Sequence, residues 1–152
     1  MYLYYWSDSC PIIGSGLLDY YRRPYKVYDW MKAVYTRVLV SLERDVTPYL
    51  IGREKVYART DSFVAKLWVT NDVDAAYDDA RISWRITHRD RGAEVASNAF
   101  AGTIPADSVE VTDHVVWAIP ADTATGEYRV DMQVTDAAGT ELSSNFMDFV
   151  VR

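Results

Sequence analysis

The chain has 152 residues, of which 49% are hydrophobic and 25% are charged, and 22 acidic residues stand against 16 basic ones. This length suits one domain with a modest extension, and the composition excludes disorder, collagen and coiled coil. Because the net charge is −6 and no apolar run approaches the ~20 residues of a membrane span, we expect neither a nucleic acid nor a membrane as a partner.

The N-terminal region predicts a short strand followed by one helix. Residues 2–6 are mostly aromatic, an opening that is typical of the interior of a longer protein. Pro24 suits the first turn of a helix, where its missing N–H costs nothing. Apolar residues then recur with helical spacing at Val27, Trp30, Met31, Val34, Tyr35, Val38, Leu39 and Leu42. We therefore predict an amphipathic helix over residues 24–43.

A shift in composition marks a domain boundary. Ten of the twelve tyrosines lie at or before residue 57, whereas the second half is rich in Val, Ala, Thr and Asp. Pro48 and Gly52 lie between the two parts. We expect a first part over residues 1–45, a linker over 46–53 and a second domain over 54–152.

The second domain has the alternating pattern of β-strands. From residue 54 onward apolar and polar residues alternate in runs separated by turn clusters. This pattern predicts a mainly β fold, an immunoglobulin-like antiparallel β-sandwich. The disulfide of antibody domains is absent, because Cys10 is the chain's single cysteine. We expect the core to contain Leu67, Val69, Trp84, Val130 and Met132.

The residues that commonly carry chemistry occur singly. His88 and His114 lie on predicted strands without a second ligand at metal spacing, so we expect no metal and no cofactor. Cys10 has no nucleophile signature and is interpreted as a small apolar residue. The loop over residues 71–79 carries four carboxylates, which suit either Ca²⁺ or a solvated connection between strands. We favour the solvated connection.

The segment from Trp6 to Lys26 resembles the end of the catalytic barrel in glycoside hydrolase family two. That family includes β-galactosidases, β-glucuronidases, β-mannosidases and exo-β-glucosaminidases, and its barrel is commonly followed by an immunoglobulin-like sandwich. The residues that match its order of motifs are Trp6, Asp8, Pro11, Gly16, Asp19, Tyr20, Tyr21 and Pro24. The stretch from Val64 to Asn71, which ends in Trp-Val-Thr-Asn, resembles the second strand of that sandwich.

The resemblance implies that residues 1–45 are the last β/α unit of a (β/α)8 barrel, with the rest of the barrel as partner and a carbohydrate as substrate. The family's two catalytic glutamates lie upstream, whereas the first glutamate here is Glu43. We therefore expect no catalytic residue and no glycosidase activity in this chain alone. Trp6 is expected either to form a sugar platform or to pack in the interior. Asp8 is expected either to bind sugar hydroxyls or to cap the loop backbone.

Two alternatives remain open at this point, a self-standing binding module and an autonomous small enzyme, and the lack of an acid/base pair or nucleophile constellation argues against the second. A self-standing module whose sandwich binds a glycan or a protein would use the helix as a docking element. The apolar stripe of the helix would lack its barrel strands in an isolated chain, so we expect it to fold back onto the sandwich or to pair with a second copy. A homodimer through the 24–43 helix is the expected form of such pairing.

Overall fold

The structure is a computed structural model and describes residues 5–8, 10, 16–44 and 56–152. The chain divides into two compact units, Met1–Thr36 and Arg37–Arg152, and each unit is described by itself. The linker expected over residues 46–53 lies outside the described residues. Within the described part, no helix is long and apolar enough to span a membrane.

The first unit contains two short strands and a helix. Strands β1 (Tyr5–Ser7) and β2 (Gly16–Leu18) pair in parallel, with Tyr5 opposite Gly16. Helix α1 (Lys26–Val34) begins two residues after Pro24, which forms a single bridge with Leu18. The expected N-terminal strand and the start of the helix near Pro24 are therefore confirmed, although residues 2–4 lie outside the described part.

The second half of the expected 24–43 helix is wrong. The helix ends at Val34, and strand β3 runs over Val38–Arg44 in the second unit. Val38 and Val40 are buried at alternate positions, and β3 pairs antiparallel with β5 (Ser62–Asn71). β-Branched residues favour strands, and an apolar run this short fits both periods, so pairing with β5 decided its conformation.

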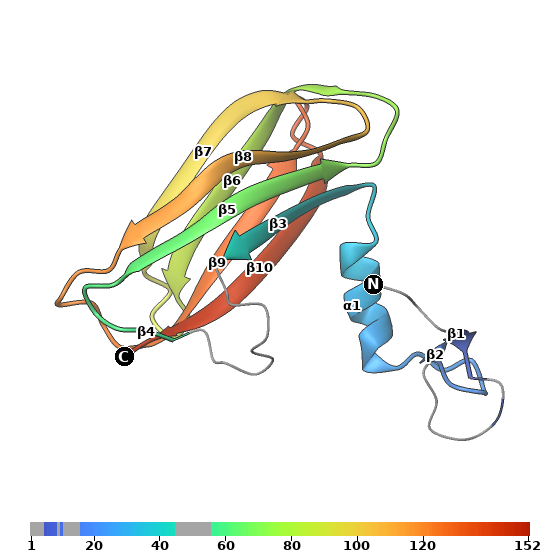
Figure 1. Cartoon of the computed structure of the whole chain (residues 1–152), viewed down its shortest axis with the longest axis horizontal. Coiled ribbons are helices and arrows are strands. Elements are labelled where there is room, and N and C mark those ends of the chain that lie inside the picture. Colours follow the sequence, from blue (N-terminus) through green and yellow to red (C-terminus); the bar gives the residue numbers. More distant parts are fainter. Residues whose placement is uncertain (1–4, 9, 11–15, 45–55) are drawn as a thin grey trace. The chain divides into compact units, whose positions relative to one another are not determined.

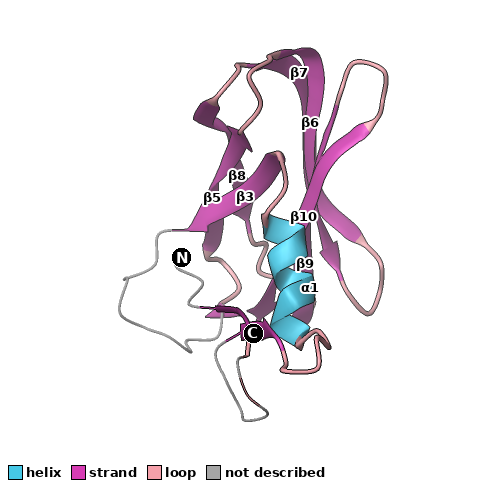
Figure 2. Ribbon diagram, turned by 90° about the vertical axis from the view of Figure 1, so that its right-hand side faces the viewer, coloured by secondary structure: helices cyan, strands magenta, loops and turns pink. Residues whose placement is uncertain are grey.

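The second unit is a sandwich of two sheets, with strand orders β4-β10-β9-β6-β7 and β3-β5-β8 (Figure 1). The expected mainly β, sandwich-like fold is confirmed, and Figure 2 shows how strands dominate the described part. Two details differ from the expectation: β3 joins the sandwich, and the short β4 pairs in parallel with β10. The remaining strands are β4 (Val56–Tyr57), β6 (Tyr77–His88), β7 (Glu94–Ile104), β8 (Ser108–Ala118), β9 (Gly126–Thr135) and β10 (Glu141–Val151).

The core lies between the two sheets. Alternate residues of β5, β6 and β9 are buried, as a strand with one face toward the interior requires. The expected core is confirmed, since Leu67, Val69, Trp84, Val130 and Met132 are all buried. Towards the end of the sandwich at which β4 pairs with β10, an aromatic cluster completes the core: Tyr57, Phe63, Trp117, Tyr128 and Phe149.

Side chains tie the two sheets together at both open sides of the sandwich. At the β3 side, Ser143 Oγ accepts a hydrogen bond from the Val40 N–H at 3.0 Å, and Asn145 Nδ2 donates to the Val40 carbonyl at 3.0 Å. At the other side, the indole N–H of Trp84 donates to Asp113 Oδ2 at 2.8 Å. These bonds supply partners to polar groups that would otherwise be buried alone.

Asp113 is expected to make the sandwich sensitive to acid. Burial by itself would raise the pKa of this carboxyl, but hydrogen bonds from Trp84, the His114 N–H and Asn98 outweigh it and hold the pKa below its ordinary value of 3.8. A lowered folded pKa stabilises the fold above the unfolded value and loses that stabilisation as the pH falls through the folded value.

We expect Asp113→Asn to lower the free energy of unfolding at pH 7 by about 1–3 kcal/mol, because it removes charge-assisted hydrogen bonds. The difference from the wild type should shrink as the pH falls below 3.8. Urea unfolding at several pH values measures both effects. Glu110→Gln, an exposed change on the same strand, is the matched control and should alter stability by less than about 0.5 kcal/mol. A pH-independent deficit in Asp113→Asn would contradict this assignment.

Candidate functional site

Asp8 connects three segments of the first unit through hydrogen bonds. Its side chain is 6% exposed. Oδ1 accepts a hydrogen bond from the Gly16 N–H at 2.9 Å, and Oδ2 accepts one from the Tyr25 hydroxyl at 2.7 Å. The backbone N–H of Asp8 donates to the Leu18 carbonyl at 2.9 Å. The carboxylate therefore joins the end of β1, the start of β2 and the residue that precedes α1.

This arrangement depends on a close approach of two backbone segments. A Cβ atom at Gly16 would lie 2.8 Å from both the backbone N and Oδ1 of Asp8, so only glycine fits without a shift. The bond to Asp8 is also the largest influence on Tyr25, and it raises the pKa of the phenol above 10.0. Asp8 thus acts on the backbone and on a tyrosine side chain, which supports the capping role.

Trp6, the other candidate, belongs to β1 by its backbone, and its side chain lies outside the described part of the structure. Asp8 lies two residues further along the chain and anchors the segment that follows β1. The described contacts are therefore those of Asp8, which follows the last residue of β1, Ser7. The sugar platform at Trp6 and the sugar contact at Asp8 stay predictions.

The histidines and the cysteine differ in their burial and contacts. His88 is 3% exposed, its Nε2 lies 3.3 Å from the Thr125 carbonyl, and its ring packs against Tyr128. His114 is exposed, and so is Cys10. Among the residues that the structure describes, no group of three His, Cys, Asp or Glu side chains is arranged to hold a metal.

The loop over residues 71–79 is organised by an amide rather than by its carboxylates. Asn71 is fully buried, and its Nδ2 donates to the carbonyls of Ala75 and Pro105 at 3.0 and 2.8 Å. Its Oδ1 accepts from the Val73 N–H at 3.1 Å. Two of these hydrogen bonds lie within the loop and one joins it to Pro105, in keeping with a connection between strands.

Glu43, the first glutamate, lies on the outer surface of the three-stranded sheet. Its carboxylate accepts hydrogen bonds from Trp68 Nε1 at 2.6 Å and Lys66 Nζ at 3.2 Å. The Trp68 bond is the largest cause that lowers its pKa, followed by the Lys66 bond. Glu43 is therefore held in its ionised form, in an ion pair with Lys66 at the surface. A general acid has the opposite property, because its pKa is raised so that it keeps its proton.

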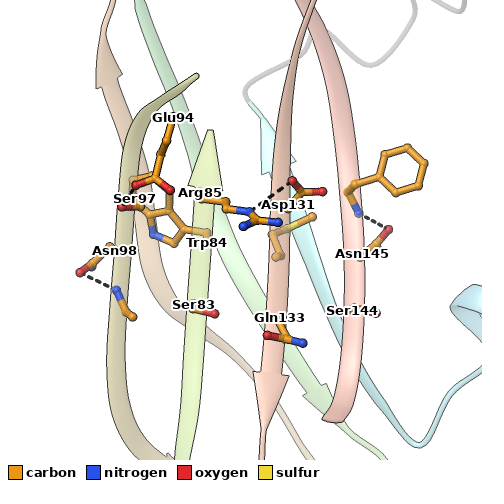
Figure 3. A pocket seen from close by; sticks show the side chains of 13 residues that line it. Ser83, Trp84, Arg85, Glu94, Ser97, Asn98, Asp131, Gln133, Ser144 and Asn145 are labelled. Carbon is orange, nitrogen blue, oxygen red and sulfur yellow. Dashed lines mark hydrogen bonds and ion pairs between the residues drawn. The ribbon is translucent and has the colours of Figure 1, made fainter. Parts of the chain in front are cut away.

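Sequence analysis missed a depression on the outer face of the five-stranded sheet. It has a volume of about 860 Å³ and is lined by side chains of β6, β7, β9 and β10. Figure 3 shows Arg85 of β6 and Asp131 of β9 pointing toward one another. Their side chains form an ion pair at 3.6 Å. Most of the outward-facing residues of the depression are ordinary polar residues of strands, so no local sequence signal could have identified it.

Comparison with known proteins supports the fold. No protein-family model matches the sequence, and neither does any curated protein. The structure is similar to the exo-chitosanase CsxA of Amycolatopsis orientalis, with a TM-score of 0.63 and 18% identity over 93% of this chain. A second structure of this enzyme, described as the exo-β-D-glucosaminidase CsxA, gives a TM-score of 0.64 and 17% identity over the same share. The chain spans 14% of the length of that enzyme.

A smaller protein shares the sandwich. The CARDB domain of the PF1109 protein from Pyrococcus furiosus, solved in complex with di-metal ions, matches with a TM-score of 0.51 and 15% identity. The match covers 76% of this chain and 85% of that one. These likenesses show an immunoglobulin-like β-sandwich domain that resembles a domain of a chitosanase and also occurs in other modules.

Proposed function

We propose that this chain is the C-terminal, non-catalytic region of a retaining glycoside hydrolase that acts on β-glycosides. The observation that carries the proposal is the order of its parts. A strand, an Asp8-centred loop and a helix with the family-two motifs precede the sandwich, and the likeness to CsxA extends over 93% of the chain. The sequence resemblance points to glycoside hydrolase family two, which includes exo-β-glucosaminidases, and the structural likeness is to an exo-β-D-glucosaminidase.

In this proposal the first unit is the last β/α unit of the catalytic barrel. β1 is the final barrel strand, and Trp6 at its end forms one wall of the sugar site. Asp8 positions that wall through its bonds to Gly16 and Tyr25, 2.9 and 2.7 Å long. The sandwich supports the barrel and carries no catalytic group. The catalytic glutamate pair, about 5–5.5 Å apart in a retaining enzyme, belongs to the upstream part.

The apolar surface of α1 fits a partner in the rest of the barrel. Val27 and Val34 are 42% and 43% exposed within this chain. Covering a large apolar side chain contributes about 1.5–3 kcal/mol. Val38 and Leu39 belong to strand β3 and not to the helix. The apolar stripe of the helix, which was expected to pair with a second copy, is therefore shorter. Barrel strands are the proposed cover, and a homodimer through α1 is the alternative.

The proposal is tested by sequencing the gene upstream of Met1 and expressing the upstream region together with this chain as one polypeptide, here called the joined protein. We expect several hundred further residues with a glutamate pair, and hydrolysis of a nitrophenyl β-glycoside with retained configuration. Trp6→Ala in the joined protein should lower kcat/KM at least tenfold, about 1.4 kcal/mol, whereas Tyr20→Ala, an exposed aromatic in the same unit, should not. The 152-residue chain alone should be inactive.

Two outcomes would contradict the proposal. One is a stop codon just upstream, with no glutamate pair in the frame. The other is hydrolysis by the purified chain that is abolished by replacing one of its own glutamates. The first would favour the alternative, a self-standing glycan- or protein-binding module, which the match to most of the CARDB chain supports. The second would show that the chain is itself an enzyme.

A further inference from the structure

The depression on the five-stranded sheet is built from two neighbouring cross-strand rows. Cα partners define one row as Ala99, Ser83, Gln133 and Ser144, and the next as Ser97, Arg85, Asp131 and Phe146. Strands lie about 4.7–4.9 Å apart, so each row is about 14 Å long. The first row carries mostly small side chains, and the larger Arg85 and Phe146 belong to the second row, which forms one wall of the depression. The result is a trough that crosses four strands (Figure 3).

The arginines at the trough are each paired with a carboxylate, which argues against an anionic ligand. Arg85 faces Asp131 at 3.6 Å, and Arg129 is held by both oxygens of Asp148 at 2.7 and 2.9 Å. Glu94 adds a further carboxylate to the lining, where it accepts a hydrogen bond from the Ser97 hydroxyl. A phosphate or carboxylate ligand would require an excess of cations here. The chain as a whole carries a net charge of −6.

Phe146 provides an apolar surface at one end of an otherwise polar wall. Its side chain is 44% exposed, and the Arg129 guanidinium lies 3.9 Å from the ring centroid. Because Arg129 is itself fixed by Asp148, the ring is held in one orientation. An oriented aromatic ring beside hydroxyl, amide and carboxylate groups matches a sugar, which has an apolar ring face and hydroxyls at its edge.

The trough does not suit an added peptide strand. Its floor is formed by β6 and β9, which are central strands with hydrogen-bonded neighbours on both sides. Strand addition uses the free N–H and C=O groups of a sheet edge. A ligand in the trough must therefore be bound through side chains. The opposite outer face has a different character, because β5 and β8 expose the apolar residues Val64, Val109, Val111 and Val116.

We propose that the trough formed by Ser83, Arg85, Gln133 and Phe146 on the outer face of the five-stranded sheet is a binding site for a neutral oligosaccharide. Phe146 carries the apolar face of one sugar ring, and the polar side chains of the two rows exchange hydrogen bonds with the hydroxyls. The site does not rest on the proposed function, since it lies within the sandwich and needs no barrel.

Titration of the ¹⁵N-labelled full chain with three neutral probes, cellotetraose, β-1,4-mannotetraose and tetra-N-acetylchitotetraose, tests the site by NMR. At least one probe should shift the amides of Ser83, Gln133 and Phe146 in a saturable way. Tetragalacturonate, which is of similar size but carries four carboxylates, should bind at least tenfold more weakly.

Variants locate the binding. Phe146→Ala should weaken it at least tenfold, and Ser83→Trp, which fills the floor, should abolish it. Val64→Thr, on the outer face of the other sheet, is the matched control and should leave binding unchanged. Dispersed NMR spectra verify that each variant is folded. The proposal is overturned if no neutral probe binds at 10 mM (roughly 3 kcal/mol), if the shifts map outside β6, β7, β9 and β10, or if Phe146→Ala binds as well as the wild type.

Discussion

Replacing Phe149 by alanine is expected to lower the free energy of unfolding by about 3–5 kcal/mol, the range for removing a buried phenylalanine. Phe149 is 2% exposed, and its ring lies 4.7 Å from Phe63, 5.5 Å from Tyr57 and 5.6 Å from Tyr128 between centroids. The truncation leaves a cavity that these rings cannot fill, because they come from three different strands. Urea unfolding followed by tryptophan fluorescence measures the change.

Phe146→Ala is the matched control, because it makes the same truncation three residues earlier on the same strand. Phe146 faces outward and is 44% exposed, so its loss removes mainly the contact with Arg129. We expect a cost below about 1 kcal/mol. Equal losses in the two variants would show that β10 does not present Phe149 to the core.

The second large effect is expected at Gly16. In Gly16→Ala the new methyl group would lie 2.8 Å from the Asp8 backbone N and 2.9 Å from the Leu18 carbonyl oxygen. Those two atoms are already joined by a hydrogen bond of 2.9 Å, so the strands must separate to admit it. Overpacking of this kind costs about 1–3 kcal/mol, or more where backbone must move.

Trypsin cleavage after Arg22, which is exposed in the first unit, reports the loss of order. A loss of 1.4 kcal/mol in the opening free energy corresponds to about a tenfold faster cleavage, and we expect at least that. Gly102→Ala is the control, since a Cβ there meets nothing within 4 Å. Unchanged cleavage of Gly16→Ala would exclude the close approach at Asp8.

Much of the sandwich was predictable from its strand pattern. A strand that packs one face against a core must alternate apolar and polar residues, and β5, β6 and β9 do so over ten or more residues each. Burial of Trp84 followed from the same alternation. Its partner Asp113 did not, because the two residues lie 29 positions apart and meet only when β6 and β8 face each other.

The stretch from Tyr35 to Leu42 shows where local pattern fails. Its apolar residues satisfy the helical period and also the alternation of a strand, so sequence alone could not separate the two. The residues up to Val34 remain helical, whereas Val38 and Val40 gain buried positions opposite Asn71 and Val69. Pairing with the distant strand β5 stabilised β3, and this pairing cannot be predicted from the local propensities of the residues in β3.

The candidate sites divide in the same way. The sequence by itself determined a β-sandwich and an N-terminal strand and helix, and it marked Asp8 as a residue with a role. Only the tertiary structure decided that the Asp8 carboxylate bonds Gly16 and Tyr25, eight and 17 positions away. Only strand register brought Ser83, Gln133 and Phe146 onto one face. Periodicity records which side of an element is buried, whereas the neighbours of a side chain depend on how distant segments pair, and that is set by the packing of the whole domain.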